Sequence, residues 1–120
     1  MGCFTFPRFF FPKHRRVRKR GAFVEIQRDG KKISGKTLLL FTHAQRTPGP
    51  ARLGVTVSRR VGGAIVRNRV KRLLREVFRL NPTWFFAGRD VVFVARPEAA
   101  ALDLVGVTDE VARLCKRVRA

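Results

Sequence analysis

The chain has 120 residues, and 27 Lys and Arg against 8 Asp and Glu give it a formal net charge of +19. This length predicts one domain with a single modest core, and a hydrophobic content of 45% is too high for a disordered basic tail. So large an excess of positive charge predicts a polyanionic partner, whether RNA, DNA or an anionic membrane surface.

The sequence offers no membrane-spanning segment. No apolar run approaches the length that crosses a bilayer. The aromatic run at residues 4–11 is too short for a signal peptide, and Pro7 and Arg8 interrupt it. We therefore expect a soluble, cytoplasmic protein.

Cysteine and histidine are scarce and scattered. Cys3 and Cys115 stand at opposite ends of the chain, which does not predict a disulfide framework and suits a reducing compartment. With His14 and His43 they make up all the soft metal ligands, and no two have zinc-ligand spacing. No metal site is predicted on the protein.

We predict that residues 1–14 are flexible and that residues 15–120 form a single domain. A helix is expected from about Arg16 to Arg28, ended by Gly30 in a left-handed conformation. Lys31–Ser34 is predicted to be a short edge strand.

Two longer strands should follow. The segment Thr37–His43 is apolar on both faces, as in a strand that is covered from both sides. Gln45–Ala51 is rich in turn residues. Arg52–Arg59 alternates, with three apolar residues on one face (Leu53, Val55 and Val57) and three small or polar residues on the other (Gly54, Thr56 and Ser58).

The stretch from Arg59 to Arg79 carries eight basic residues and one acid, Glu76. Apolar residues recur at helical spacing and predict one buried face, made of Val66, Val70, Leu73, Leu74 and Val77. The opposite face gathers Asn68, Lys71, Arg72, Arg75 and Arg79, with Arg67 and Arg69 near its borders. A merely solubilising face mixes charges of both signs, so this one indicates nucleic-acid phosphate.

A loop at Asn81–Arg89, a buried strand at Asp90–Ala95 and a last helix with Asp103 as its N-cap complete the chain. The order helix, three strands, helix, strand and helix predicts an α+β fold, a single-domain α-β-β-β-α-β-α sandwich around one four-stranded sheet.

The run SRRVGGAIVRNRVKRLLREVFR, with Arg67-Asn68-Arg69 at its centre, resembles the signature of the bacterial ribonuclease P protein component. The similarity extends from about Pro12 to Val118. It implies that the central helix makes an atypical left-handed crossover between parallel strands, as in the ribosomal protein S5 domain 2-like fold, although such connections are nearly always right-handed.

The resemblance also implies a role for particular residues. The RNA subunit of ribonuclease P would be contacted by the basic stretch, at Arg59, Arg60, Arg67, Asn68, Arg69, Lys71, Arg72 and Arg75. The single-stranded 5′ leader of precursor tRNA would lie in a cleft between the first helix and the sheet, lined by Phe23, Leu39, Phe41, Thr56 and Ser58. Catalysis, with its Mg²⁺ ions, would belong to the RNA subunit, and the protein would hold neither catalytic residue nor metal.

Two positions depart from the family pattern. Gly63 stands where Asn is usual, at the start of the central helix, and Gln27 stands where a second aromatic of the first helix is usual.

Three other functions fit the composition. A ribosomal protein of similar size and charge would need no single-strand cleft. A metal-free ribonuclease would need His14 and His43 as acid and base, but the rest of the chain shows no catalytic motif. A DNA-binding module would place the basic helix in a major groove. The expected partners are the RNA subunit and precursor tRNA, with no membrane and no obligate protein partner.

Overall fold

The computed structural model describes residues 16–17, 20–45, 49–85 and 87–119. The segment 1–14 that we predict to be flexible lies outside them. The elements in chain order are α1 (Arg20–Asp29), β1 (Lys31–Ser34), β2 (Leu38–Ala44), β3 (Arg52–Val57), α2 (Ala64–Leu80), the short 3₁₀ helix η2 (Pro82–Trp84), β4 (Arg89–Ala95), the 3₁₀ helix η3 (Pro97–Ala101) and α3 (Leu104–Arg119).

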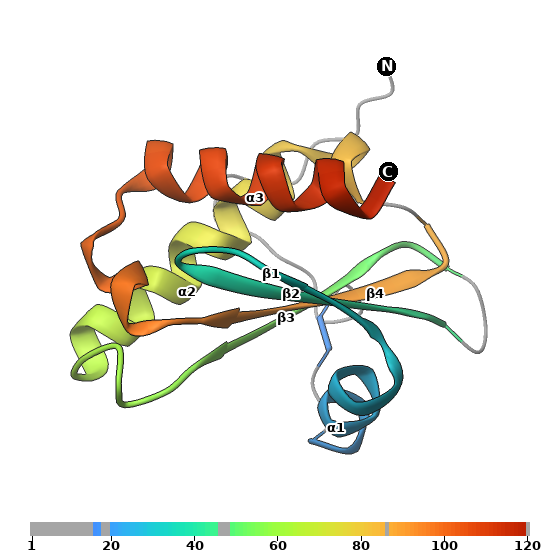
Figure 1. The fold of residues 1–120 in the computed structure, drawn as a ribbon, viewed down its shortest axis with the longest axis horizontal. Coiled ribbons are helices and arrows are strands. Elements are labelled where there is room, and N and C mark those ends of the chain that lie inside the picture. The colour runs from blue at the N-terminus through green and yellow to red at the C-terminus, as the bar shows by residue number, and fades with distance from the viewer. Residues whose placement is uncertain (1–15, 18–19, 46–48, 86, 120) are drawn as a thin grey trace.

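One four-stranded sheet forms the middle layer, in the order β1-β2-β4-β3. Strand β2 is antiparallel to β1 and to β4, whereas β3 and β4 are parallel. Helix α1 lies on one face of the sheet, and α2 and α3 lie together on the other (Figure 1). The predicted α+β sandwich and the edge position of β1 are confirmed.

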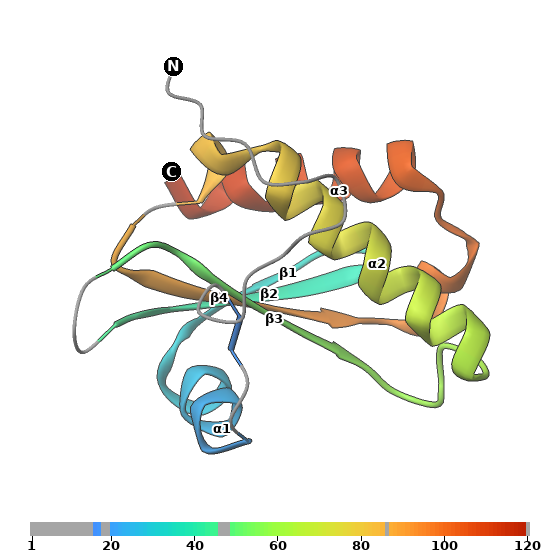
Figure 2. The same ribbon diagram turned by 180° about the vertical axis from the view of Figure 1, so that it is seen from behind.

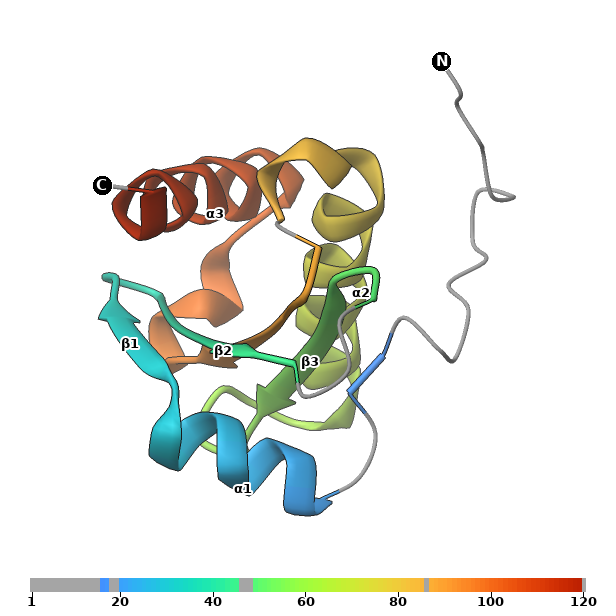
Figure 3. The ribbon, with the colours of Figure 1, turned by 90° about the vertical axis from the view of Figure 1, so that its right-hand side faces the viewer.

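The connection from β3 through α2 to β4 has the expected rare handedness. With both parallel strands pointing up and α2 toward the viewer, β4 lies to the left of β3 (Figures 2 and 3). The crossover is therefore left-handed, against the rule for parallel strands.

Alternation along the strands divides the apolar side chains between the two faces. The larger core fills the space between the sheet and the α2–α3 layer, because every second strand residue points there, as Leu40, Leu53 and Phe93 do. A smaller cluster of Val17, Ile26 and Val92 lies on the α1 face. No helix of the described residues is long and apolar enough to cross a bilayer.

The start of α1 differs from our prediction. The helix begins at Arg20 rather than Arg16, and Arg16 forms a parallel bridge with Leu53 of β3. The N–H of Val17 donates to the carbonyl of Leu53 at 2.8 Å. Strand β3 is an edge strand with unpaired backbone groups, so these two residues pair with it instead of extending the helix.

The predicted left-handed conformation of Gly30 is also wrong, because Gly30 does not have a positive φ. Its N–H donates to the carbonyl of Ile26 at 2.9 Å. A Cβ at this position would meet that carbonyl oxygen and lie 2.7 Å from the carbonyl oxygen of Thr42. Glycine is required here because the end of α1 rests directly on the backbone of β2.

The predicted cap of α3 is confirmed. Asp103 accepts a hydrogen bond from the N–H of Gly106 at 2.8 Å through its carboxylate, which satisfies one of the orphan donors at the start of α3. The helix therefore begins at Leu104, where the apolar spacing placed it.

Candidate nucleic-acid interface

Helix α2 buries one side and turns a cationic side outward. Val70, Leu74, Val77 and Phe78 are buried against the core. About 180° around the helix, Asn68 and Arg72 are exposed. Arg59 and Arg60, which follow the end of β3, are exposed beside the start of the helix. We define the α2 basic face as the seven residues Arg59, Arg60, Arg67, Asn68, Lys71, Arg72 and Arg75.

Arg69 was expected to contact RNA, but its guanidinium is engaged inside the protein. It donates to the carbonyl of Leu102 at 2.7 Å and to the carbonyl of Ala100. The carbonyl of Ala100 belongs to η3, and that of Leu102 belongs to the segment that joins η3 to α3. Arg69 is half-buried and holds this segment against α2, so it is not part of the α2 basic face as we define it.

The acid in this helix neutralises only one arginine. Glu76 accepts two hydrogen bonds from Arg79, one turn further along, at 3.2 and 2.5 Å. Among the described residues, no ion pair involves Arg67, Lys71 or Arg72. The positive charge of most of the face is thus left for an external anion.

One flank of the face lies close to the N-terminal end of the described chain. Burial lowers the pKa of the half-buried Arg75, and the positive charge of Arg16 lowers it further. Arg16 belongs to the segment that bridges to β3, so the fold brings two cations together from distant parts of the sequence. An anion that approached both would be favoured by each of them.

The start of α2 has no side-chain cap. Gly63 is the N-cap residue, in the extended conformation usual there, and offers no side chain to the first turn. Gly62 before it has φ of +157°, and a Cβ there would crowd Val66 at 3.0 Å. The backbone N–H groups of the first turn therefore receive no side-chain cap, and that turn contains no acidic residue.

The opposite face of the sheet, beneath α1, presents side chains in three rows across β2, β4 and β3. The strand register places Leu39, Val94 and Thr56 in the first row, Phe41, Val92 and Gly54 in the second, and His43, Asp90 and Arg52 in the third. All of these residues except Val92, Gly54 and Asp90 are half-buried. Side chains on this face are therefore partly open to solvent on both sides of α1.

Helix α1 sits on the second row. The ring of Phe23 lies directly over Gly54, because a Cβ on Gly54 would be 2.7 Å from Cε1 of that ring. Phe23 and Phe41 both pack against the cluster that contains Val92, and both keep part of their surface exposed. Leu39 and Thr56 extend this surface into the first row. These four of the five residues expected in the cleft lie on one face, which we call the α1-sheet cleft.

The fifth residue, Ser58, lies just past the end of β3. It is exposed, and its hydroxyl oxygen accepts a hydrogen bond from the N–H of Arg60 at 3.3 Å. This places Ser58 at the turn between the α1-sheet cleft and the α2 basic face. Gln27, where the family usually has an aromatic residue, is exposed on α1.

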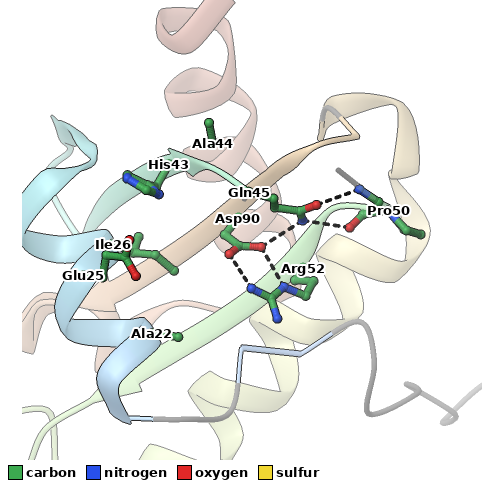
Figure 4. Close-up of a pocket in the computed structure, with 10 residues that line it drawn as sticks. Ala22, Glu25, Ile26, His43, Ala44, Gln45, Pro50, Arg52 and Asp90 are labelled. Atoms are coloured by element: carbon green, nitrogen blue, oxygen red, sulfur yellow. Dashed lines mark hydrogen bonds and ion pairs between the residues drawn. The ribbon is translucent and has the colours of Figure 1, made fainter. Parts of the chain in front are cut away.

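A polar network that the sequence did not predict fills the third row (Figure 4). The carboxylate of Asp90 is buried and accepts two hydrogen bonds from Arg52, at 2.8 and 2.6 Å. The amide of Gln45 donates to the same carboxylate at 2.9 Å and to the carbonyl of Pro50 at 3.0 Å. This network closes the loop between β2 and β3.

Above the network lies a hollow of about 400 Å³ between α1 and the sheet. Ala22, Glu25 and Ile26 of α1 form one wall, and His43 and Asp90 form part of the other. Only the strand register could have indicated this site, since its residues are dispersed through the sequence.

The fold and these two surfaces define a small, strongly basic α+β protein with a largely unneutralised cationic helix on one side of its sheet and half-buried aromatic rings on the other. The family model for ribonuclease P matches residues 11–119. The chain belongs to the ribonuclease P protein component family.

Individual relatives and solved structures agree with this family assignment. The chain is 40% identical over 114 residues to the ribonuclease P protein component of Desulfovibrio desulfuricans, covering 92% of this chain and 88% of that one. It is 36% identical over 110 residues to that of Desulforapulum autotrophicum, covering 92% and 93%. The RNase P protein from Thermotoga maritima superposes with a TM-score of 0.76 at 30% identity, covering 85% of this chain and 96% of that one. The Staphylococcus aureus RNase P protein, at 24% identity, shares the fold with a TM-score of 0.81 over 88% and 95% of the chains.

Proposed function

We propose that this protein binds the catalytic RNA subunit of ribonuclease P through the α2 basic face. The observation that carries this proposal is the cluster of exposed cations, Arg59, Arg60 and Arg72, that have no acidic partner among the described residues. Arginine suits phosphate because its planar guanidinium donates two parallel hydrogen bonds. The uncapped start of α2 adds backbone donors on the same side.

The α1-sheet cleft is the proposed binding surface for the single-stranded 5′ leader of precursor tRNA. Phe23 and Phe41 keep part of their rings exposed, and aromatic rings stack on bases of any sequence. Ser58 and Arg60 lie where this surface meets the α2 basic face, so a strand leaving the cleft would reach the cations directly.

In this proposal the protein holds no catalytic group, and hydrolysis and the Mg²⁺ ions that serve it belong to the RNA subunit. The protein orients the precursor and reduces the repulsion between phosphates. The endonucleolytic cut then releases the leader and leaves the mature 5′ end of the tRNA. We place this activity in the cytoplasm, with the RNA subunit and precursor tRNA as the partners.

Reconstitution with a bacterial ribonuclease P RNA and a precursor tRNA tests the proposal. At low magnesium, where the RNA alone cleaves poorly, addition of the protein should restore processing, because its +19 charge replaces part of the counterion screening. A magnesium requirement that does not change with protein would refute the role.

The alternatives have separate tests. A ribonuclease acting alone would cleave without any RNA subunit, and replacing His14 and His43 by Ala would then lower the cleavage rate at least about a hundredfold. A ribosomal protein would bind precursor and mature tRNA alike, whatever the leader length. A DNA-binding module would prefer duplex DNA to structured RNA in direct competition.

A further inference from the structure

Three potential metal ligands meet where the last turn of α1 crosses β2. One ligand atom from each of Glu25, Asp29 and His43 lies within 4.8 Å of the other two. The two carboxylates are one helical turn apart, so they project from the same side of α1. His43 comes from β2, far away in the sequence. Among the described residues, this is the one group of three His, Cys, Asp or Glu side chains close enough to share an ion.

The packing of the backbone fixes this arrangement. The end of α1 rests on β2 at Gly30, where a side chain would collide with the carbonyl of Thr42. Asp29 precedes Gly30 and His43 follows Thr42, so the two ligands flank the point of closest approach between the elements. Regular secondary structure therefore holds the three groups together, which is the arrangement that a preorganised site needs.

We propose that Glu25, Asp29 and His43 bind one divalent first-row transition ion of the Mn²⁺ and Zn²⁺ class. Two carboxylate oxygens with one imidazole nitrogen suit these ions, whereas Mg²⁺ prefers oxygen ligands alone and retains most of its water. Three protein ligands leave coordination positions open. Glu25 and His43 also line the hollow of about 400 Å³ (Figure 4), which leaves room for water at those positions.

Arg28 competes with the ion for Asp29. Its guanidinium donates to both carboxylate oxygens of Asp29, each at 3.0 Å. The side chains are 68% and 45% exposed, and an ion pair this open to water is readily exchanged.

The site is separate from the proposed leader contact. Glu25 lies two positions after Phe23 on α1, and residues two apart on a helix point to nearly opposite sides. The ion would therefore bind on the flank of α1 that faces the third row of the sheet, away from Leu39 and Thr56. Binding can be measured on the protein alone, with no RNA present, and its outcome does not depend on the proposed function.

The test is a titration of the reduced full chain with Mn²⁺, followed by electron paramagnetic resonance of the free ion. Mn²⁺ binds carboxylate and imidazole but not thiols, which avoids the two cysteines. We expect one ion per chain, with amide NMR signals near Asp29 and His43 broadened first. Equimolar Zn²⁺ should displace the Mn²⁺, and equimolar Mg²⁺ should not.

Variants then assign the ligands. His43→Ala, Glu25→Gln and Asp29→Asn should each weaken Mn²⁺ binding at least tenfold, with thermal melting in the absence of metal as a check on folding. His14→Ala, which alters the only other histidine, is the matched control and should bind as the wild type does. Unchanged affinity in His43→Ala, or displacement of Mn²⁺ by equimolar Mg²⁺, would overturn the proposal.

Discussion

The guanidinium of Arg69 lies 2.7 Å from the carbonyl oxygen of Leu102 and donates a hydrogen bond to it. This bond joins the cationic helix α2 to the segment that leads into α3. Although Arg69 stands in the middle of the basic run, its guanidinium donates to two backbone carbonyls of the protein itself. Arg72, three positions further along the helix, is exposed.

Arg69→Ala should therefore act on stability. Hydrogen bonds from a charged donor to half-buried carbonyls are each worth about 1.5–3 kcal/mol, so we expect the free energy of unfolding to fall by roughly that amount or more. Urea denaturation measures it. Arg69→Lys is the informative control variant, because it keeps the positive charge and loses the planar guanidinium that donates both hydrogen bonds. A Lys variant as stable as the wild type would show that the carbonyl contacts do not matter.

Arg72→Ala should show the opposite pattern. Arg72 is exposed and avoids the buried stripe of α2, so the melting temperature should stay unchanged. Affinity for the RNA subunit should fall, and the slope of log affinity against log salt should decrease by about one unit for the lost phosphate contact. Binding measured at several salt concentrations decides this. An unaltered slope would remove Arg72 from the interface.

Phe23 is half-buried, so its removal should affect both leader binding and stability. Phe23→Ala should weaken precursor tRNA binding by about 1–3 kcal/mol and leave mature tRNA binding unchanged. The loss of stability should remain below the roughly 3–5 kcal/mol of a fully buried ring. Val24→Ala, on the same helix and 49% exposed, is the matched control. Equal losses for the two tRNAs would contradict the cleft assignment.

Gly54→Ala offers a second way to disturb the same ring. The added Cβ would lie 2.7 and 2.9 Å from two ring atoms of Phe23, so the ring must move although no functional group is removed. We expect a loss of leader-dependent affinity in binding assays that compare precursor with mature tRNA, with assembly on the RNA subunit retained. Full leader affinity in this variant would argue against stacking by Phe23 in its present position.

The uncapped start of α2 allows a test of whether RNA phosphate approaches it, by placing a neutral or a negatively charged side chain at Gly63. A Cβ at Gly63 meets nothing within 4 Å, and the backbone conformation suits an N-cap side chain. Gly63→Asn and Gly63→Asp should each stabilise the helix by a few tenths of a kcal/mol, about the difference between these caps and glycine. If RNA phosphate approaches this helix start, only Asp should weaken assembly. Similar affinities for the two variants would place the RNA elsewhere.

Glu110 should make stability depend on pH. Burial raises the pKa of this carboxyl, but hydrogen bonds from Arg113 at 2.8 Å and from the N–H of Thr37 at 3.1 Å outweigh burial and leave the pKa below its ordinary value. A lowered pKa in the folded state gives stability that is complete above the unfolded value of about 4.3 and is lost as pH falls through the folded value. Urea denaturation between neutral and acid pH should show a smaller decline for Glu110→Gln than for the wild type.

Local patterns in the sequence were sufficient to predict most of the elements of the fold. Alternation in Arg52–Arg59 and the apolar stripe of α2 predicted which faces are buried, and Asp103 marked the start of α3; the strand itself ends at Val57. The start of α1 could not be found this way, because Arg16 and Val17 pair with an edge strand that is distant in the sequence. The conformation of Gly30 likewise depends on the backbone of Thr42, a tertiary contact that turn propensity cannot reveal.

For the sites too, some residues could be placed from the sequence and others depend on tertiary contacts. Phe23, Phe41, Leu39 and Thr56 were placed by family resemblance. The strand register puts Phe41, Leu39 and Thr56 on one face of the sheet, and Phe23 of α1 lies over Gly54 on that face. Arg69 looked like its neighbours, because nothing in the local sequence indicates its two carbonyl partners, Ala100 in η3 and Leu102 just after it. Helical spacing puts Glu25 and Asp29 on the same side of α1, but His43 joins them only because α1 packs on β2.

Strand β4 has a consequence for synthesis on the ribosome. Among the described residues it is the last strand, yet it lies between β2 and β3 and is the only strand to which β3 pairs along its length. Until residues 89–95 have been made, β3 has no strand partner and the larger core has no central strand. The sheet therefore cannot close before β4 has been made, and the cationic α2 emerges before the structure that will hold it. The fold can be completed only after β4, which η3 and α3 follow in the chain.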